Sequence, residues 1–235
     1  TGAARTTVLA NVQSMDMLDV ETGAIRPLLT AAQAHAVHPL SDRFAPDQSN
    51  FQNPKFSPDG SRLFVVFGTE IHRKQGGEAP GIKSLVLIDP DADEVRYIGE
   101  FGHHPMWLPD GSGIIAFERQ PGGGQCLMQY PLDGGQPTVF LDDLAGTHCA
   151  LDRAGQRLVT DVFDTPKPGY ASIVLVDIKT GRRETLVTGR HDNRAHVGGA
   201  HPHPQWSRDE SRILFNLADT GMPQLYAVAV GITLP

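Results

Sequence analysis

Histidines recur at one position of an internal repeat, and their ring nitrogens are the groups of this chain best suited to chemistry. His104, His148 and His203 open segments that align without gaps, with the sequences HPMWLPDG, HCALDRAG and HPQWSRDE. A fourth segment, NPKFSPDG, has Asn53 at the same place. These four residues follow one another at spacings of 51, 44 and 55 residues. Neutral imidazoles that converge on one point bind Zn, Mn, Fe, Co or Ni ions, so the repeat position is a candidate metal or anion site.

The elements that position these histidines are expected to be strands. Each segment precedes a short apolar run, with the sequences RLFVVF, GIIAF, RLVTDVF and RILFNL. A polar loop and a second such run follow, and the first three units add a further extended piece. Asp-Gly and Thr-Gly pairs stand where hairpins need tight turns. About four strands in each repeat of roughly 40–50 residues are typical of a β-propeller blade, whereas a β-sandwich would not carry this periodic turn motif.

We therefore predict an all-β fold in which residues 1–235 form one β-propeller domain of four-stranded antiparallel blades, with about five blades present. The predicted parts are a partial blade at 1–30, an irregular linker at 31–50, and blades at 51–101, 102–146, 147–200 and 201–235. Two arrangements of the ends stay open. Either the partial ends pair into one closing blade, or the chain is part of a longer, seven-bladed propeller whose upstream blades are missing.

Rotation about a propeller axis relates equivalent positions of the blades, so the aligned histidines should point toward one place at a channel mouth. His201 and His103 lie beside them in sequence, and Gln52 or water could complete a ligand shell. For any single histidine, the alternative is a strand-entry residue whose ring faces solvent or the backbone. The predicted metal ligands are His104, His148, His201 and His203.

The segment RHDNRAHVGGAHPH leads into the last histidine pair and could approach the same mouth. It contains His191, Arg194 and His196. For Arg194, contact with a ligand and a plain surface charge remain equal alternatives.

The remaining histidines and the tryptophans have simpler interpretations. We expect His35, His38 and His72 to be surface residues of loops. Trp107 and Trp206 occupy one position of the repeat, which predicts that they pack between blades.

Composition excludes several classes of function. The chain has 27 acidic and 20 basic residues and a formal net charge of −7, which argues against a general nucleic-acid binder. No apolar run approaches the roughly 20 residues needed to cross a bilayer, so we expect no membrane partner. The two cysteines, Cys126 and Cys149, suggest no disulfide framework, and they leave a cytoplasmic or a periplasmic location open.

The repeat resembles that of TolB-like propellers over almost the whole chain, through its PxWSPDGxxIxF pattern. The segment HPHPQWSRDESRILFNLADTGMPQLYAVAV looks like the C-terminal blade of oligogalacturonate lyases, and GHHPMW is similar to their GHExW segment. This resemblance implies a seven-bladed propeller in which three histidines and a glutamine hold Mn. The histidines match His104, His201 and His203, whereas Gly198 stands at the place of the glutamine. His148 could compensate, because a similar histidine opens a blade in TolB-like relatives of the lyases.

The resemblance implies a metal-dependent lyase that cleaves uronic-acid-containing oligosaccharides by β-elimination, with Mn as cofactor and an acidic oligosaccharide as partner. For this reaction we predict a non-ligating histidine, His103 or His196, as the base and Arg194 as the clamp on a carboxylate. The alternative is a non-catalytic TolB-like propeller that binds a protein or peptide at the channel mouth. A glycoside hydrolase ranks last, because it needs two carboxyl groups about 5–10 Å apart and the acidic residues lie in turns.

Overall fold

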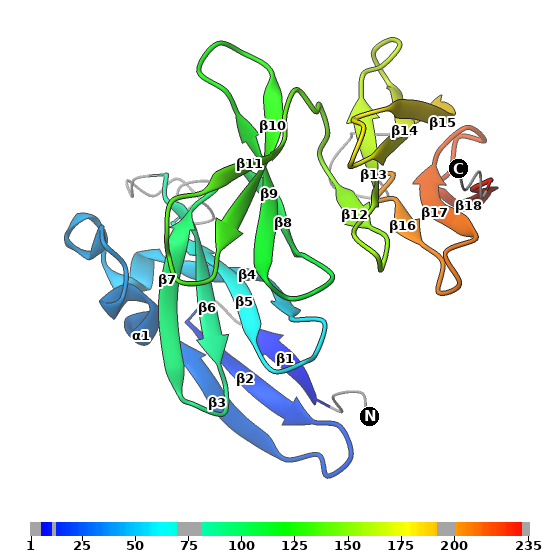
Figure 1. The fold of residues 1–235 in the computed structure, drawn as a ribbon. Helices are drawn as coiled ribbons and strands as arrows, with labels where there is room; N and C mark the ends of the chain where they lie inside the picture. Colours follow the sequence, from blue (N-terminus) through cyan, green and yellow to red (C-terminus); the bar gives the residue numbers. More distant parts are fainter. Residues whose placement is uncertain (1–5, 11–12, 70–80, 192–200, 232–235) are drawn as a thin grey trace. The chain divides into compact units, whose positions relative to one another are not determined.

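The structure is a computed structural model that describes residues 6–10, 13–69, 81–191 and 201–231. Nearly all regular elements of this part are strands (Figure 1). The exceptions are helix α1 (Ala31–Ala36) and two 3-10 turns, Ser41–Arg43 and Pro46–Gln48. The strands form the blades of a β-propeller, which confirms the predicted fold class.

Three internal sheets have four strands each, and within each sheet every strand lies beside its neighbour in sequence. This simple meander is the topology expected of a propeller blade. The strands of these sheets are β4 (Asn50–Phe56), β5 (Leu63–Gly68), β6 (Lys83–Asp89) and β7 (Glu94–Glu100); β8 (His103–Trp107), β9 (Gly113–Arg119), β10 (Gln125–Pro131) and β11 (Thr138–Leu141); and β12 (Cys149–Leu151), β13 (Arg157–Phe163), β14 (Tyr170–Asp177) and β15 (Arg183–Arg190).

The first and last sheets have three strands each within the described residues. Their strands are β1 (Thr6–Ala10), β2 (Ser14–Asp19) and β3 (Ile25–Thr30), and β16 (Gln205–Trp206), β17 (Arg212–Leu217) and β18 (Gln224–Ala229). The five sheets agree with the expected number of about five blades, some of them incomplete. The blade boundaries and the arrangement of the chain ends stay predictions.

The chain forms two compact units. The first contains Thr1–Gly102 together with Gly111–Ile114 and Tyr130–Thr138. The second contains His103–Asp110, Ile115–Gln129 and Val139–Pro235, and it therefore holds all the predicted metal ligands.

In the first unit, the predicted linker 31–50 packs against the sheet β4–β7. A capping box starts α1, because the Thr30 hydroxyl accepts the Gln33 backbone N–H at 3.2 Å and the Gln33 side chain accepts the Thr30 N–H at 2.9 Å. The helix buries Ala31 and Ala34 in one apolar cluster with side chains of β5, including Leu63. The linker is thus folded onto the blade by an apolar face.

His38 in this linker is a core residue, so the prediction of a surface histidine is wrong for it. The residue is 2% exposed, and its Nε2 lies 2.8 Å from the Ser84 hydroxyl. Its Nδ1 accepts the backbone N–H of Leu40 at 3.1 Å, so Nε2 carries the proton and donates to Ser84. His35 is half-buried and bonds through Nε2 to the carbonyl of Phe44 at 2.7 Å. His72 lies outside the described residues.

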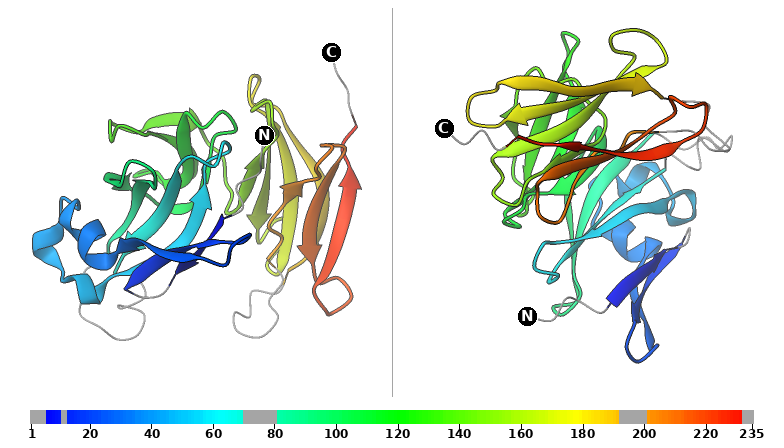
Figure 2. Two further views of the ribbon diagram at one scale, coloured as in Figure 1. Left: turned by 90° about the horizontal axis from the view of Figure 1, so that it is seen from below. Right: turned by 90° about the vertical axis from the view of Figure 1, so that its right-hand side faces the viewer.

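In the second unit, the sheets β12–β15 and β16–β18 lie side by side, as both views of Figure 2 show. Trp206 joins them: its indole N–H donates to the carbonyl of Ala150 at 3.0 Å, and the Arg157 guanidinium stacks on the ring at 4.6 Å. Ala150, Val159 and Ile213 belong to the apolar cluster beside this ring. Trp206 therefore packs between blades as predicted, and Trp107 is also buried.

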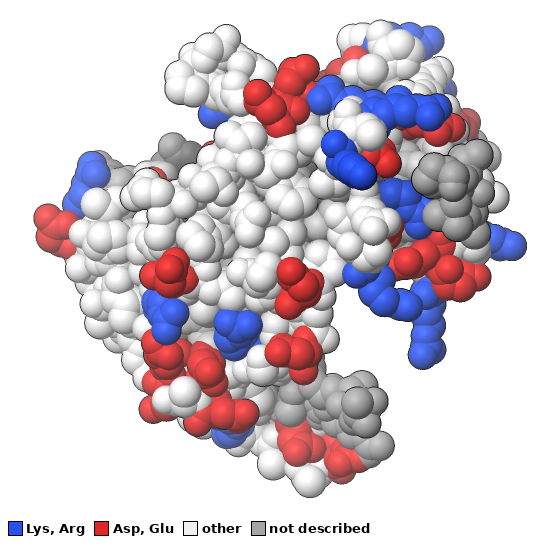
Figure 3. All heavy atoms as spheres, viewed as in Figure 1, with Lys and Arg blue, Asp and Glu red and all other residues white. Residues whose placement is uncertain are grey.

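Acidic and basic side chains lie near one another at several places on the face drawn in Figure 3. Within the described part of the chain, no helix has the length and apolar character needed to cross a membrane.

Candidate metal centre

His148, His201 and His203 lie together in the second unit. Each offers a ring nitrogen, and these three atoms all lie within 4.8 Å of one another. The ring centroids are 3.6 Å apart for His148 and His203, and 5.7 Å apart for His148 and His201. Nitrogens that share an ion at about 2.0–2.2 Å lie roughly 3–3.5 Å apart, so small side-chain movements would close this group around a cation.

His104 stands beside this group of three. Its ring centroid is 4.2 Å from that of His148 and 6.4 Å from that of His203. His103 is exposed, and its ring centroid is 6.3 Å from that of His104. All four histidines predicted as ligands thus lie in one neighbourhood, with three of them in the tighter group.

The backbone explains why the repeat position turns a side chain toward the site. Asn53, His104 and His203 have φ angles of 50°, 46° and 44°, in the left-handed region. In the first of these repeats, the pairing of β4 with β5 shifts between Gln52 and Lys55, which marks a bulge. Bulges re-aim side chains, and Asn, Asp and His enter the left-handed region more readily than most residues with a Cβ.

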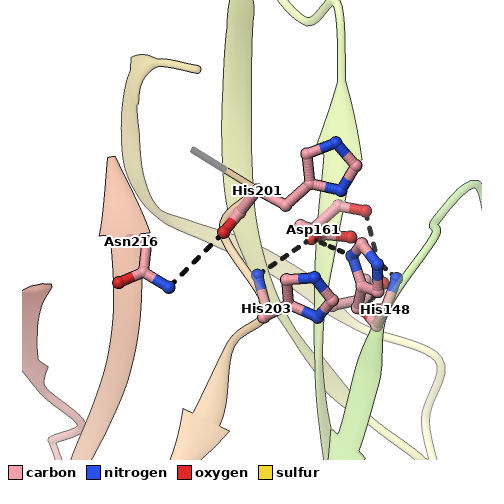
Figure 4. A network of polar contacts seen from close by, with 6 residues as sticks. His148, Asp161, His201, His203 and Asn216 are labelled. Atoms are coloured by element: carbon pink, nitrogen blue, oxygen red, sulfur yellow. Dashed lines mark hydrogen bonds and ion pairs between the residues drawn. The ribbon is translucent and has the colours of Figure 1, made fainter. Parts of the chain in front are cut away.

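His148 is held in a different way, by two residues of β13. Its backbone N–H donates to Asp161 Oδ1 at 2.8 Å, and its carbonyl accepts the Thr160 hydroxyl at 2.9 Å. Its ring Nδ1 lies 2.7 Å from Asp161 Oδ2 (Figure 4). The ring Nε2 is buried and has no hydrogen-bond partner. The third histidine of the repeat is thus fixed by side chains rather than by a left-handed backbone.

Sequence reasoning missed Asp161. The sequence did carry a signal for it. The residue 13 positions after the start of each aligned segment is apolar in the first two repeats, Val66 and Phe117, but polar in the last two, Asp161 and Asn216. Both polar residues hold histidine-bearing segments. Asp161 Oδ2 accepts the His203 N–H at 3.3 Å, and Asn216 donates through its backbone to Pro202 at 2.9 Å and through its side chain to the His201 carbonyl at 3.5 Å.

The surroundings favour the metal-binding form of His201. Partial burial lowers the pKa of this imidazole, and the nearby His148 lowers the pKa further, against an opposing effect of Asp161. A neutral ring offers a lone pair to a cation, whereas a protonated ring repels it.

An aromatic ring bounds the group. Phe163 contacts His201 and His191, with centroid distances of 5.4 and 4.8 Å. His191 is buried, and its Nε2 is 3.5 Å from Asp164 Oδ1. Of the segment that precedes the last histidine pair, this residue is therefore placed near the site.

Arg194, His196 and Gly198 lie outside the described residues. Gln52 belongs to the first unit, where its side-chain amide donates to Asn50 at 3.0 Å.

Solved structures share this fold. An oligogalacturonate lyase in complex with manganese is 19% identical with a TM-score of 0.66, over 94% of this chain and 55% of that one. TolB from Acinetobacter baumannii is 14% identical with a TM-score of 0.64, over 96% of this chain and 49% of that one. An oligogalacturonate lyase from Vibrio parahaemolyticus is 13% identical with a TM-score of 0.59, over 97% and 75%.

The chain thus spans about half the length of the first two of these proteins. The similarity shows the propeller fold that the repeat predicted. No family model matches the sequence, and no curated protein matches it significantly.

Proposed function

We propose that this chain is a metal-dependent lyase that cleaves uronic-acid-containing oligosaccharides by β-elimination. The observation that carries the proposal is the group of His148, His201 and His203, three ring nitrogens within 4.8 Å on the fold of a manganese-containing oligogalacturonate lyase. The acidic oligosaccharide and the choice of Mn are parts of this proposal.

These three histidines would hold the ion through their ring nitrogens, and three protein ligands leave further positions open for water or substrate. The buried, unpartnered Nε2 of His148 fits such a role, because buried polar atoms in folded proteins nearly always have a partner. When bound, a divalent cation supplies a Lewis acid that stabilises the charge developing on the uronate carboxylate.

The reaction also needs a proton acceptor. In β-elimination, the C–H bond on the carbon beside the carboxylate breaks, a double bond forms, and the C–O bond to the neighbouring sugar breaks, while the leaving oxygen takes up a proton from water. We assign the acceptor role to His104, in place of the ligand role that the repeat position and the resemblance predicted for it. Its ring lies 4.2 Å from that of His148 yet outside the group of three, and an imidazole accepts protons efficiently near neutral pH.

His104 also replaces His103 as the candidate base. The His103 ring is exposed and neighbours that of His104, at 6.3 Å between centroids, rather than that of a member of the group of three. His196 as an alternative base and Arg194 as the carboxylate clamp stay predictions outside the described residues. The clamp would use the bidentate geometry that guanidinium and carboxylate groups form.

A non-catalytic propeller that binds a protein or peptide is the second candidate. The similarity to TolB supports it, because the TM-score of 0.64 is close to that of the lyase and both identities are low. In that case the histidine group would bind a cation or an acidic side chain of the partner without chemistry.

The deciding experiment follows the ultraviolet absorbance of the unsaturated product from oligogalacturonates with added Mn²⁺. Wild-type protein should form product, whereas His203→Ala and His104→Gln should not. His35→Gln, in the first unit, is a histidine control that should retain activity. Equal product from wild type and His203→Ala, or none with Mn²⁺, Zn²⁺, Co²⁺ or Ni²⁺, would favour the binding propeller.

A further inference from the structure

We propose that Asp161 is a positioning residue that presets the metal centre, fixing the His148 ring and tying the His203 backbone to the same carboxylate. The part of this inference that concerns the ion rests on the proposed function. The hydrogen-bond geometry on which it stands does not depend on the reaction.

Asp161 is fully buried, and its two oxygens accept three hydrogen bonds (Figure 4). Oδ1 accepts the His148 backbone N–H at 2.8 Å, and Oδ2 lies 2.7 Å from His148 Nδ1. Oδ2 also accepts the backbone N–H of His203 at 3.3 Å. One side chain thus fixes both the backbone and the ring of one member of the histidine group and the backbone of another.

The bond to the ring decides which nitrogen faces the group. An ionised carboxylate only accepts hydrogen bonds, so Nδ1 of His148 must donate, and the lone pair of the neutral ring then lies on Nε2. That Nε2 is the buried atom without a partner. Histidines that bind metals usually donate the other ring N–H to a carboxylate or carbonyl, which fixes the tautomer and strengthens the ligand.

Asp161 also joins two neighbouring sheets of the second unit. It belongs to β13, whereas His203 precedes β16 of the next sheet. Because one carboxylate bonds to both, the distance between His148 and His203 is set before any ligand arrives. The side chains then lose their conformational freedom during folding rather than during binding, so binding carries a smaller entropic cost and the affinity is higher.

Asp152 offers a matched control. It is a buried aspartate of the same blade, but it accepts hydrogen bonds from Gln156, in the turn before β13, and from Arg157, the first residue of β13. Asp152→Asn therefore removes a buried carboxylate and its ion pair without touching the histidine group.

The first measurement needs no metal. Long-range ¹H–¹⁵N spectra of the metal-free protein report the ring tautomers, and His148 is expected as the Nδ1–H form in wild type. Asp161→Asn should shift it toward the Nε2–H form, whereas Asp152→Asn should leave it unchanged. A wild-type His148 that carries its proton on Nε2 would overturn the inference, even if no variant can be purified.

The second measurement is calorimetric titration of the metal-free proteins with Mn²⁺ alone. Asp161→Asn should weaken binding about 10–100-fold, the loss typical of removing a partner of a metal-binding histidine, while Asp152→Asn stays within about twofold. Equal affinity of Asp161→Asn and wild type, an equal loss in Asp152→Asn, or no binding by wild type would contradict the inference. Mn²⁺ binding that depends on Asp161 without product formation would leave the inference standing and reject the lyase.

Discussion

His104 and His203 share one unusual backbone conformation, with φ angles of 46° and 44°, at equivalent positions of two repeats. Asn53 has a φ of 50° at the same position of the first repeat, although it lies in the other compact unit. The left-handed turn therefore recurs at three of the four repeat positions, with His148 as the exception, and its presence at Asn53 shows that it does not depend on a histidine at this position. In the second unit the residue in this turn is His104 or His203, and there the turn presents an imidazole to the site.

Substitutions at Asn53 should reveal the backbone requirement without touching the histidine group. Asn53→Val should lower the free energy of unfolding by about 1–2 kcal/mol, because a β-branched residue is disfavoured in the left-handed region. Asn53→Gly should be close to neutral. Urea unfolding of both variants measures the difference, and equal stability of the two would contradict a strained turn.

Gly146 should tolerate no side chain. A Cβ at this position would clash with the hydroxyl of Thr160, which holds the His148 carbonyl, and would lie 2.6 Å from the Phe117 ring. We expect Gly146→Ala to cost about 1–3 kcal/mol of stability, as is usual for an overpacked core. Gly122→Ala is the control, because nothing lies within 4 Å of a Cβ there. Thermal or urea unfolding compares the two.

Acid should destabilise the protein partly through His38. Burial lowers the pKa of this ring from 6.5 to about 4, with a smaller effect of His35. The unfolded chain therefore binds more protons than the folded one between these values, so the contribution is complete above pH 6.5 and is lost as the pH falls toward 4. The loss should be on the order of 3 kcal/mol, because each pKa unit corresponds to about 1.4 kcal/mol.

The comparison that isolates His38 is the difference in stability between wild type and His38→Gln as a function of pH. Glutamine can still donate to Ser84 but does not titrate. This difference should favour wild type at pH 7 and shrink between pH 6.5 and 4. A difference that stays constant over this range would show that His38 does not carry the effect.

Metal should stabilise the folded chain. An ion that binds only the folded state at a concentration 100 times its Kd adds about 2.7 kcal/mol. We expect Mn²⁺ to raise the melting temperature of wild type, a chelator to reverse the rise, and His203→Ala to show none. A similar rise in His203→Ala would place the binding elsewhere.

The repeat allowed the fold and the neighbourhood of the site to be predicted, because a turn motif that returns with each blade places equivalent residues in equivalent positions. His104, His148 and His203 came together for this reason. Asp161 escaped notice because one polar residue in an apolar strand does not reveal its partner, which here is 13 residues away, just before the neighbouring strand β12. Its role depends on three hydrogen bonds to its two carboxylate oxygens, and this arrangement is visible only in the structure.

His38 was misjudged for a related reason. Its segment reads as an irregular linker, and such segments usually lie at the surface. Here the apolar face of α1 folds the linker onto the sheet β4–β7, and the ring finds Ser84, 46 residues away in sequence. A local pattern predicts whether a segment forms a helix or a loop, but a buried polar contact at long range depends on the packing of the whole unit.

The central claim, a metal ion held by His148, His201 and His203, is tested most directly by elemental analysis. Wild type and the three single alanine variants are stripped with a chelator, reloaded with Mn²⁺, freed of unbound metal and measured. The account predicts a single bound ion per wild-type chain and a large loss of metal in each variant. A wild-type chain that retains no ion, or variants that retain as much as wild type, would contradict it.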